Sequence, residues 1–234
     1  ADITVSFVGL KLGLFLAEGL NHAGEMCFAD LGIAPELSAD LLPALLLCGT
    51  EDVEGLLPLR AANAHKGEFG HVLVVGGNLG MGGAVRMSAE AALRAGAGLV
   101  SVATRRASAA AVLSGRPELM VRGVEDASEL DALISRASII ALGPGLGRDD
   151  WARQCFGRVL QSPARKVLDA DALNLLAEQP QRRNDWVLTP HPGEAGRLLG
   201  VSAREIQADR LNAVRELQSR YGGAVVLKGR GTLV

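Results

Sequence analysis

The stretch from residue 71 to residue 102 constrains the fold more than any other part of the chain. After His71 comes the apolar run 72–75, which is short and rich in β-branched residues, as in a buried parallel strand. Five glycines lie among the next eight residues, 76–83, and they allow the backbone to turn sharply and approach a ligand. A helix-forming segment, 84–95, and a second apolar run, 99–103, follow. This pattern predicts a βαβ unit whose glycine loop lies at the carboxyl end of a parallel sheet, where such sheets bind ligands.

Strand-like and helix-like segments alternate through the rest of the chain. We expect further strands at 118–124, 138–142, 166–168, 186–188 and 224–227, and helices at 105–114, 128–136 and 149–161. Residues 202–220 are predicted to form one long amphipathic helix, with Ser202 and Glu205 as a capping box at its start. The predicted fold class is therefore α/β, with a mainly parallel central sheet and helices on both faces.

The first 68 residues follow a different pattern. Strands are expected at 3–8 and 27–33, and the polar stretch 49–68 is typical of a domain boundary. We predict a tail of one domain at 1–50, a linker at 51–61 and a second domain at 62–234. The last residues, 225–234, stop in the middle of what looks like a strand pair, where ladder hydrogen bonds would be left unmade. We therefore expect the chain to be a piece of a longer protein.

The composition argues against several kinds of partner. A net charge of −2 gives no indication of a nucleic-acid or membrane surface, and no apolar run approaches the roughly 20 residues of a membrane span. The three cysteines, Cys27, Cys48 and Cys155, lie far apart, and their odd number suits structural thiols in a reducing compartment. We expect a cytoplasmic protein with no nucleic-acid or membrane partner.

Four predicted strands end in unusual loops, at 76–83, 143–147, 169–174 and 189–194, and a fifth ends in the basic turn 228–232. The carboxyl ends of parallel strands meet at one edge of a sheet, so these loops should converge on one site. This convergence is the main argument for a site, because each motif alone is weak. An ordinary tight turn remains the alternative for the glycine loop and for 143–147, whose amides could instead cradle a phosphate.

The glycine loop matches neither common phosphate-binding motif. Gly83 and Ala84 stand where a Walker loop has lysine and a hydroxyl residue, and Val85 stands where a dinucleotide fingerprint has its third glycine. The second strand ends in Arg105 and Arg106 rather than an acid. An arginine there suits a 2′-phosphate, so a non-catalytic NADP-binding module stays open as an alternative.

Two of the later loops carry polar side chains suited to chemistry. We expect one of Asp169 and Asp171 to cap the following helix, and the other, with Asn174, to orient a ligand or magnesium-bound water. Prolines flank His191, which places it at a helix N-cap with Glu194 three residues later. Histidine is a poor cap, so we favour ligand contact for His191 over capping alone.

The remaining basic residues are interpreted by position. His22, His65 and His71 are expected at the surface or in the linker. Lys228 begins the basic glycine turn, and there it can meet phosphates as a point charge while the glycines expose amides. A hairpin turn with solvated charges is the alternative, and the position on the shared edge favours nucleotide contact.

Taken in order, these motifs resemble the ribokinase-like fold and, more closely, the NAD(P)H-hydrate dehydratase family. The matching segments share glycine-rich or polar loops after apolar strands, and they are 65–67, 70–77, 90–98, 143–147, 169–174, 189–194 and 226–232. The resemblance covers about 62–234. Residues 1–36 resemble the end of the Rossmann-like NAD(P)H-hydrate epimerase domain that precedes the dehydratase in bifunctional bacterial repair enzymes.

The resemblance implies an activity. The family uses ADP, or ATP in eukaryotes, to dehydrate the S-epimer of NADH or NADPH hydrate (NAD(P)HX) back to the working cofactor, by phosphoryl transfer to the ring hydroxyl and loss of phosphate. It implies Mg²⁺ with the nucleotide, and K⁺ for an epimerase that interconverts the R- and S-hydrates in the full-length protein, which we expect to be a homo-oligomer. A small-alcohol or vitamin-precursor kinase of the same fold is the alternative enzyme.

The resemblance also implies roles for particular residues. Ala84, Gly145 and His191 match hydrate-binding positions, and the nucleotide segment corresponds to Lys228, Gly229, Arg230, Gly231 and Thr232. Magnesium or phosphate would meet Glu194, Asp169, Asp171 and Asn174, although His191 stands where related kinases have asparagine. The catalytic base of the family is an Asp in a glycine-rich loop that would follow Val234, so we expect no catalytic residue in this piece and no activity from it alone.

Overall fold

The computed structural model describes residues 1–38, 40–56 and 59–234, which form two compact units, Ala1–Asn63 (unit 1) and Ala64–Val234 (unit 2). The predicted linker, 51–61, lies within unit 1, and its residues 57 and 58 are outside the described residues. Within the described ranges, no helix is both long enough and apolar enough to cross a membrane.

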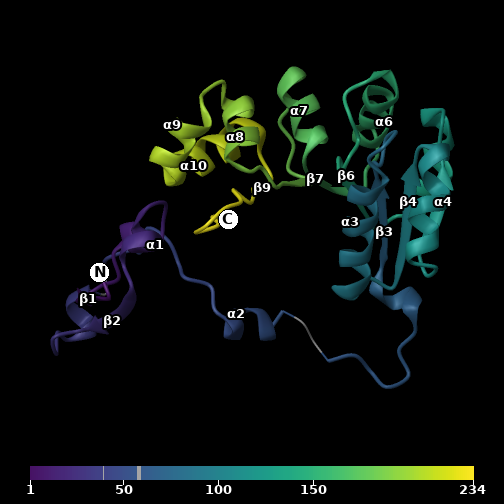
Figure 1. Cartoon of the computed structure of the whole chain (residues 1–234). Coiled ribbons are helices and arrows are strands. Elements are labelled where there is room, and N and C mark those ends of the chain that lie inside the picture. The colour runs from purple at the N-terminus through teal and green to yellow at the C-terminus, as the bar shows by residue number, and fades with distance from the viewer. Residues whose placement is uncertain (39, 57–58) are drawn as a thin grey trace. The chain divides into compact units, whose positions relative to one another are not determined.

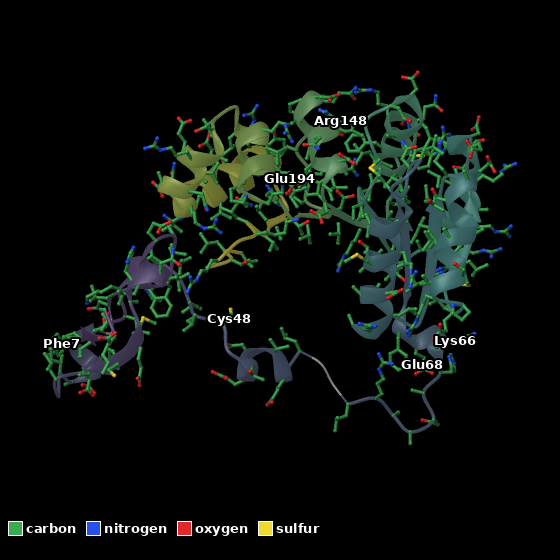
Figure 2. The ribbon with its side chains drawn as sticks, in the orientation of Figure 1. Phe7, Cys48, Lys66, Glu68, Arg148 and Glu194 are labelled. Carbon is green, nitrogen blue, oxygen red and sulfur yellow. The ribbon has the colours of Figure 1, made fainter. Side chains whose placement is uncertain are left out.

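Unit 1 contains a parallel pair of strands, β1 (Ile3–Phe7) and β2 (Glu25–Ala29), joined through a short 3-10 helix (Leu12–Leu14) and α1 (Gly19–His22). A second 3-10 helix (Pro35–Ser38) and α2 (Thr50–Glu54) follow. The strand predicted at 27–33 begins earlier and ends at Ala29, because the chain turns through positive φ angles at Leu31 and Gly32. Phe7, labelled in Figure 2, and Phe28 are each about half exposed. This pair of strands therefore has little core of its own.

Unit 2 is built on one seven-stranded sheet in the order β5-β4-β3-β6-β7-β8-β9, and every neighbouring pair is parallel (Figure 1). In chain order the strands are β3 (His71–Val75), β4 (Leu99–Thr104), β5 (Met120–Gly123), β6 (Ile139–Leu142), β7 (Arg165–Leu168), β8 (Trp186–Leu188) and β9 (Ala224–Val225). The mainly parallel α/β fold predicted from the sequence is confirmed.

The helices of unit 2 are α3 (Gly82–Arg94), α4 (Arg106–Gly115), α5 (Asp131–Ile134), α6 (Asp150–Leu160), α7 (Asp171–Glu178), α8 (Pro192–Leu199), α9 (Ala203–Ala208) and α10 (Arg210–Tyr221), with 3-10 helices at Lys66–Phe69 and Ala127–Leu130. Three successive residues of β3, Leu73, Val74 and Val75, are almost fully buried. Successive side chains of a strand point to opposite faces, so both faces of the sheet are covered. One face packs on α3 and α4 through a core that includes Val85 and Val112.

Two helix predictions are wrong in detail. The single helix predicted at 202–220 is broken into α9 and α10 at Asp209, whose carboxylate accepts a hydrogen bond from the Asn212 N–H, 3.0 Å away, and caps the second helix. The Ser202–Glu205 capping box is confirmed. The helix predicted at 128–136 is a 3-10 turn followed by the single turn of α5.

The cysteines fall into two groups. Cys155 is fully buried on α6, and burial raises the pKa of its thiol to about 12. This burial agrees with a structural thiol. Cys27 and Cys48 are exposed in unit 1, so the structural role predicted for all three cysteines fits Cys155 alone.

The order of the strands creates a switch point between β3 and β6. From β3 the chain continues outward through β4 and β5, then crosses back to β6 on the other side of β3 and continues outward to β9. In open parallel sheets such a point opens a crevice at the carboxyl ends of the strands. Gly145 lies in the loop after β6, and Ala84 lies in the first turn of α3, directly after the loop that follows β3, so both are next to this switch point.

Candidate active site

The glycine loop (76–83) and the 143–147 loop are joined directly at the switch point. The Gly77 N–H donates to the Pro144 carbonyl (3.0 Å) and the Asn78 N–H donates to the Gly145 carbonyl (2.7 Å). A Cβ placed on Gly145 would lie 3.3 Å from the Cβ of Ala84. Two of the predicted hydrate-binding positions, Ala84 and Gly145, therefore lie side by side.

Asn78 holds the same two loops together through its side chain, which is 5% exposed. Its Nδ2 donates to the Leu146 carbonyl and to Asp149 Oδ2, both at 3.0 Å, and its Oδ1 accepts the Leu79 N–H at 2.8 Å. All of its polar atoms are thus engaged within the site. The sequence interpretation missed Asn78, and the only signal was a polar residue within a glycine-rich loop.

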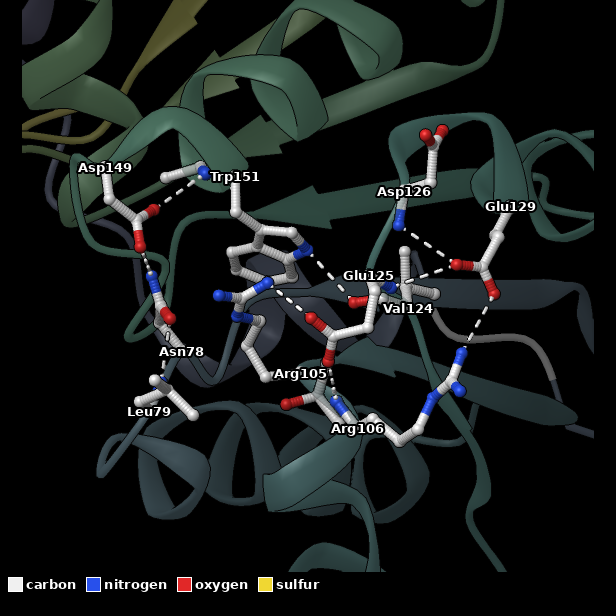
Figure 3. A network of polar contacts seen from close by, with 12 residues as sticks. Asn78, Leu79, Arg105, Arg106, Val124, Glu125, Asp126, Glu129, Asp149 and Trp151 are labelled. Carbon is white, nitrogen blue, oxygen red and sulfur yellow. Dashed lines mark hydrogen bonds and ion pairs between the residues drawn. The ribbon is translucent and has the colours of Figure 1, made fainter.

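Asp149 connects this pair of loops to α6. Its Oδ1 accepts the Ala152 N–H at 3.0 Å, so it is the N-cap of α6. Burial alone would raise the pKa of Asp149, but the hydrogen bonds from Asn78 and Ala152 and the nearby charge of Arg105 hold it below its ordinary value. Asp149 is therefore ionised and fixed in place at neutral pH (Figure 3).

Arg105 and Arg106, which suggested an NADP-binding module as an alternative function, both form ion pairs within the protein. Arg105 Nη1 is 2.5 Å from Glu125 Oε2, and its guanidinium carbon lies 5.2 Å from the centre of the Trp151 ring. Arg106 lies 3.8 Å from Glu129 in the same network (Figure 3). These contacts give both arginines a structural role beside the glycine loop.

The acids of the 169–174 loop reach across the site instead of capping their own helix. The N-cap of α7 is Ala170, which has a φ of 49° and makes no side-chain cap bond. Asp171 Oδ2 accepts the N–H of Gly147 (2.8 Å), and Asp171 Oδ1 accepts from Asn174 Nδ2 (3.2 Å). The prediction that one of Asp169 and Asp171 caps α7 is wrong, because Asp171 bonds the 143–147 loop and Asp169 bonds Lys228.

His191 is a true N-cap, and both parts of its capping box form. Its Nδ1 accepts the N–H groups of Gly193 (2.9 Å) and Glu194 (3.3 Å), while Glu194 Oε2 accepts the His191 N–H (2.8 Å). Pro192 is the first helical residue, as predicted. Since Nδ1 is an acceptor here, the proton of the neutral ring is on Nε2, and the side chain is 56% exposed. Capping therefore occurs, and the exposed Nε2 edge lies 3.4 Å from Glu194 Oε1.

His71 is not the surface residue that was predicted. It is the first residue of β3, partly buried, and its Nε2 lies 2.8 Å from the Ser101 hydroxyl on β4. Burial lowers its pKa. It lies at the amino end of the strand, away from the site loops, whereas His22 and His65 are exposed as expected.

Lys228 connects three loops at the nucleotide segment. Its Nζ is 2.5 Å from Asp169 Oδ1 and 3.9 Å from Oε2 of the buried Glu194, and its N–H donates to the Pro190 carbonyl at 2.8 Å. The turn that follows is closed by a bridge between Leu227 and Leu233. Together with the contacts above, these bonds make one continuous row of loops from the glycine loop to the basic turn, as the convergence argument predicted.

Arg210, on α10, was not predicted as a site residue, although it is 3% exposed directly behind the basic turn. Its Nη2 donates to the carbonyls of Leu227 (3.0 Å), Gly231 (3.1 Å) and Lys228 (3.3 Å), and its Nη1 donates to Gln207 Oε1 (2.6 Å). Burial lowers its pKa. The sequence offered no signal, since an arginine in an apparently continuous amphipathic helix is usually exposed.

The residues suggested for magnesium lie in two pairs. Asp169 and Glu194 both flank Lys228, whereas Asp171 and Asn174 bond each other. Among the described residues, no group of three or more His, Cys, Asp or Glu side chains could hold a metal ion by itself. Mg²⁺ commonly binds through one or two carboxylates together with substrate phosphates, so the pair beside Lys228 suits an ion that arrives with a nucleotide.

The seven-stranded parallel sheet, with its polar loops gathered at one edge, is the fold of the ribokinase-like α/β proteins. A family model described as NAD(P)H-hydrate dehydratase matches residues 72–234. The chain belongs to the NAD(P)H-hydrate dehydratase family.

Three relatives illustrate the match. The chain is 50% identical over all of its 234 residues to the bifunctional NAD(P)H-hydrate repair enzyme Nnr of Coxiella burnetii, of which it covers 48%. It is 41% identical to the ADP-dependent (S)-NAD(P)H-hydrate dehydratase of Neisseria meningitidis, over 75% of this chain and 61% of that protein. The crystal structure of the ADP/ATP-dependent NAD(P)H-hydrate dehydratase of Bacillus subtilis, co-crystallised with ATP and Mg²⁺, superposes with a TM-score of 0.69 and 32% identity, covering 78% and 66% of the two chains. The chain spans about half the length of the bifunctional relatives that it matches.

Proposed function

We propose that this chain forms part of an ADP-dependent (S)-NAD(P)H-hydrate dehydratase. The observation that carries the proposal is the row of bonded loops at the carboxyl edge of the sheet, in which the family's hydrate-binding and nucleotide-binding segments come together. The names of the Neisseria and Bacillus relatives support ADP or ATP as the cosubstrate. In the full-length protein, the resemblance of 1–36 to an epimerase tail supports a second, epimerase activity that uses K⁺. By the same resemblance, 1–50 is the proposed epimerase tail, 51–61 the linker and 62–234 the dehydratase domain.

The proposed binding roles follow the two ends of the row. Ala84 and Gly145 form a close wall for the damaged nicotinamide ring, since both lack a side chain beyond Cβ and they lie beside each other. His191 donates from Nε2 to a polar atom of the hydrate. Lys228 to Thr232 hold the nucleotide, with Lys228 meeting its phosphates as a point charge.

The chemistry proposed is phosphoryl transfer followed by elimination. The ring hydroxyl of the hydrate loses its proton as its oxygen takes the β-phosphoryl group of ADP, and AMP leaves. The C–O bond then breaks, phosphate leaves, the adjacent ring carbon loses a proton, and the double bond of NAD(P)H forms. Phosphate is a far better leaving group than hydroxide, and such transfer depends on positioning and charge stabilisation more than on covalent help.

Magnesium fits this scheme as a companion of the nucleotide. When bound, it would neutralise charge on the phosphates, with Asp169 and Glu194 as the nearby carboxylates. Lys228 already lies between these two carboxylates and orients them toward the nucleotide segment. Asp171 and Asn174 are better suited to fixing the 143–147 loop.

The direct test is an assay of the full-length protein with NADHX, ADP and Mg²⁺, following recovery of NADH absorbance. Recovery that requires ADP, with release of AMP and phosphate, supports the proposal. A stable phosphorylated product would instead favour a small-alcohol or vitamin-precursor kinase, and binding of NADPH without ADP would favour an NADP-binding module. The proposed compartment is the cytoplasm, where both substrates would occur, and the proposed assembly is a homo-oligomer.

A further inference from the structure

Arg210 is a buried cation without a carboxylate partner among the described residues. The matching case is Lys166, also buried, whose Nζ lies 2.8 Å from Asp185 and which hydrogen-bonds two carbonyls besides. Arg210 instead bonds three carbonyls and one amide oxygen, and its Nε is buried with no hydrogen-bond partner. Burying an unpaired charge is costly, so its position needs a reason beyond packing.

The three carbonyls that Arg210 binds all belong to the turn that carries the nucleotide segment. In a planar trans peptide the carbonyl and the following N–H point in opposite directions, and the described chain contains no cis peptide bond. When the Leu227, Lys228 and Gly231 carbonyls point toward the guanidinium, the N–H groups of the next residues point away from it. The first of these N–H groups, that of Lys228, points away from the guanidinium and donates to the Pro190 carbonyl.

The other two outward N–H groups are those of Gly229 and Thr232. Gly229 has a φ of 136°, and a Cβ there would lie 3.2 Å from Arg210 Nη1, so glycine permits both the turn and its close approach to the guanidinium. The Thr232 hydroxyl closes the turn by donating to the Gly229 carbonyl at 2.8 Å. The result is a turn with three carbonyls directed at the guanidinium and the N–H groups of Gly229 and Thr232 directed away from it, where outward backbone N–H groups can meet an anion.

We propose that Arg210 is a positioning residue for the nucleotide: it fixes the basic turn so that the Gly229 and Thr232 N–H groups face the phosphate or ribose oxygens of ADP. The charge of Lys228 is matched by Asp169 and Glu194, so the unmatched charge of Arg210 supplies the positive potential that favours a polyanion. This inference rests on the proposed function, because it takes the nucleotide segment to be 228–232.

The test compares Arg210→Lys with Arg215→Lys in the full-length protein. Lysine keeps the charge at 210 but has one compact ammonium, which cannot span three carbonyls and Gln207 as the guanidinium does. Arg215 is exposed on the same helix and serves as the matched control. For Arg210→Lys we expect roughly tenfold weaker ADP binding by calorimetry and an equal rise in the KM for ADP, with the KM for NADHX unchanged. A purely structural role would change both KM values together with the melting temperature.

Chemical rescue and a second variant keep the test decisive. Arg210→Ala should recover ADP binding when millimolar guanidinium is added, and Gln207→Ala, which loosens only Nη1, should weaken ADP binding about threefold. Unchanged ADP affinity in Arg210→Lys, or in Gln207→Ala where Arg210→Lys does not fold, overturns the inference. A wild-type protein that binds ADP but restores no NADH overturns the proposed function alone, and one that binds no ADP overturns both.

Discussion

The two ends of the row of site loops are held together by different chemistry. At the hydrate end, the loops 76–83 and 143–147 are joined by backbone hydrogen bonds and by the neutral amide of Asn78. At the nucleotide end, Lys228 lies between two carboxylates and joins the 228–232 turn to the 189–194 loop, and the guanidinium of Arg210 binds carbonyls of the turn from behind. The chemistry at each end therefore matches the ligand proposed to bind there: neutral contacts for the nicotinamide ring and charged groups for the phosphates.

This difference has physical consequences. Neutral hydrogen bonds depend little on ionic strength, and they place backbone and small side chains close together, which suits a flat ring lying against Ala84 and Gly145. Charged groups create a positive potential that favours phosphates, and they respond to pH and to loss of a partner. Substitutions at the two ends should therefore change the KM of different substrates, and the following predictions test that separation.

The largest effect is expected for Lys228→Met. It removes a charge-assisted contact to phosphate and leaves Asp169 and Glu194 facing each other's charge without a cation between them. We expect kcat/KM for ADP to fall about 100-fold, which corresponds to roughly 2.7 kcal/mol, with a much smaller change in the KM for NADHX. Steady-state kinetics with each substrate varied in turn measures this.

Lys228→Arg is the control, since it keeps the charge and should retain most of the ADP affinity. An equal loss for both substrates would show that the nucleotide end and the hydrate end are one cooperative unit and would break the comparison.

An intermediate effect, dependent on pH, is expected for Asn78→Asp. The new carboxylate would lie where Asn78 Nδ2 now donates to Asp149 Oδ2 at 3.0 Å. Two carboxylates this close raise the pKa of one of them above its unfolded value, so stability is lost as pH rises through the raised pKa and regained below it. We expect a melting temperature several degrees lower and a KM for NADHX about tenfold higher near pH 8, both partly restored near pH 5.

Asn212→Asp, on the exposed side of α10, is the matched control and should show neither effect. A penalty at Asn78→Asp that does not depend on pH would mean that Asp149 moves away, and that Asn78 does not hold the two loops in the way described.

Much of this site could be predicted because buried parallel strands have a simple sequence pattern. The run 186–188 matches β8 residue for residue, and the run 72–75 covers all of β3 except its first residue, His71, since both faces of these strands are covered and apolar residues fill them. Once the strands are parallel, convergence of their loops follows from geometry alone. The N-cap positions of His191 and Ser202 follow in the same way from local spacing.

The parts that could not be predicted depend on tertiary contacts. The apolar periodicity continues through Asp209, and only its bond to the Asn212 N–H ends one helix and begins the next. Ala170 adopts a φ of 49° that nothing in its side chain favours, because Asp169 and Asp171 are drawn to other loops. Arg210 is buried by a turn that lies 17 or more residues later in the chain, and no local pattern reports such a contact.

The smallest effect is expected for His191→Asn, which separates capping from binding. Asparagine is among the best N-cap residues, so it should keep the hydrogen bonds to the Gly193 and Glu194 N–H groups and change stability by no more than about 0.5 kcal/mol. It removes the imidazole and its Nε2 donor, so we expect the KM for NADHX to rise about fivefold while the KM for ADP stays constant. Thermal melts and two-substrate kinetics give both readouts.

The His191 variant also tests which end of the row of loops this residue belongs to. His191 lies in the same 189–194 loop as Glu194, at the nucleotide end, yet we propose that it contacts the hydrate. A rise in the KM for ADP would place the imidazole with the phosphates and extend the charged end of the row to the whole 189–194 loop. If neither the KM for NADHX nor the KM for ADP changes in His191→Asn, capping is the whole contribution of His191, and Ala84 and Gly145 bind the hydrate without it.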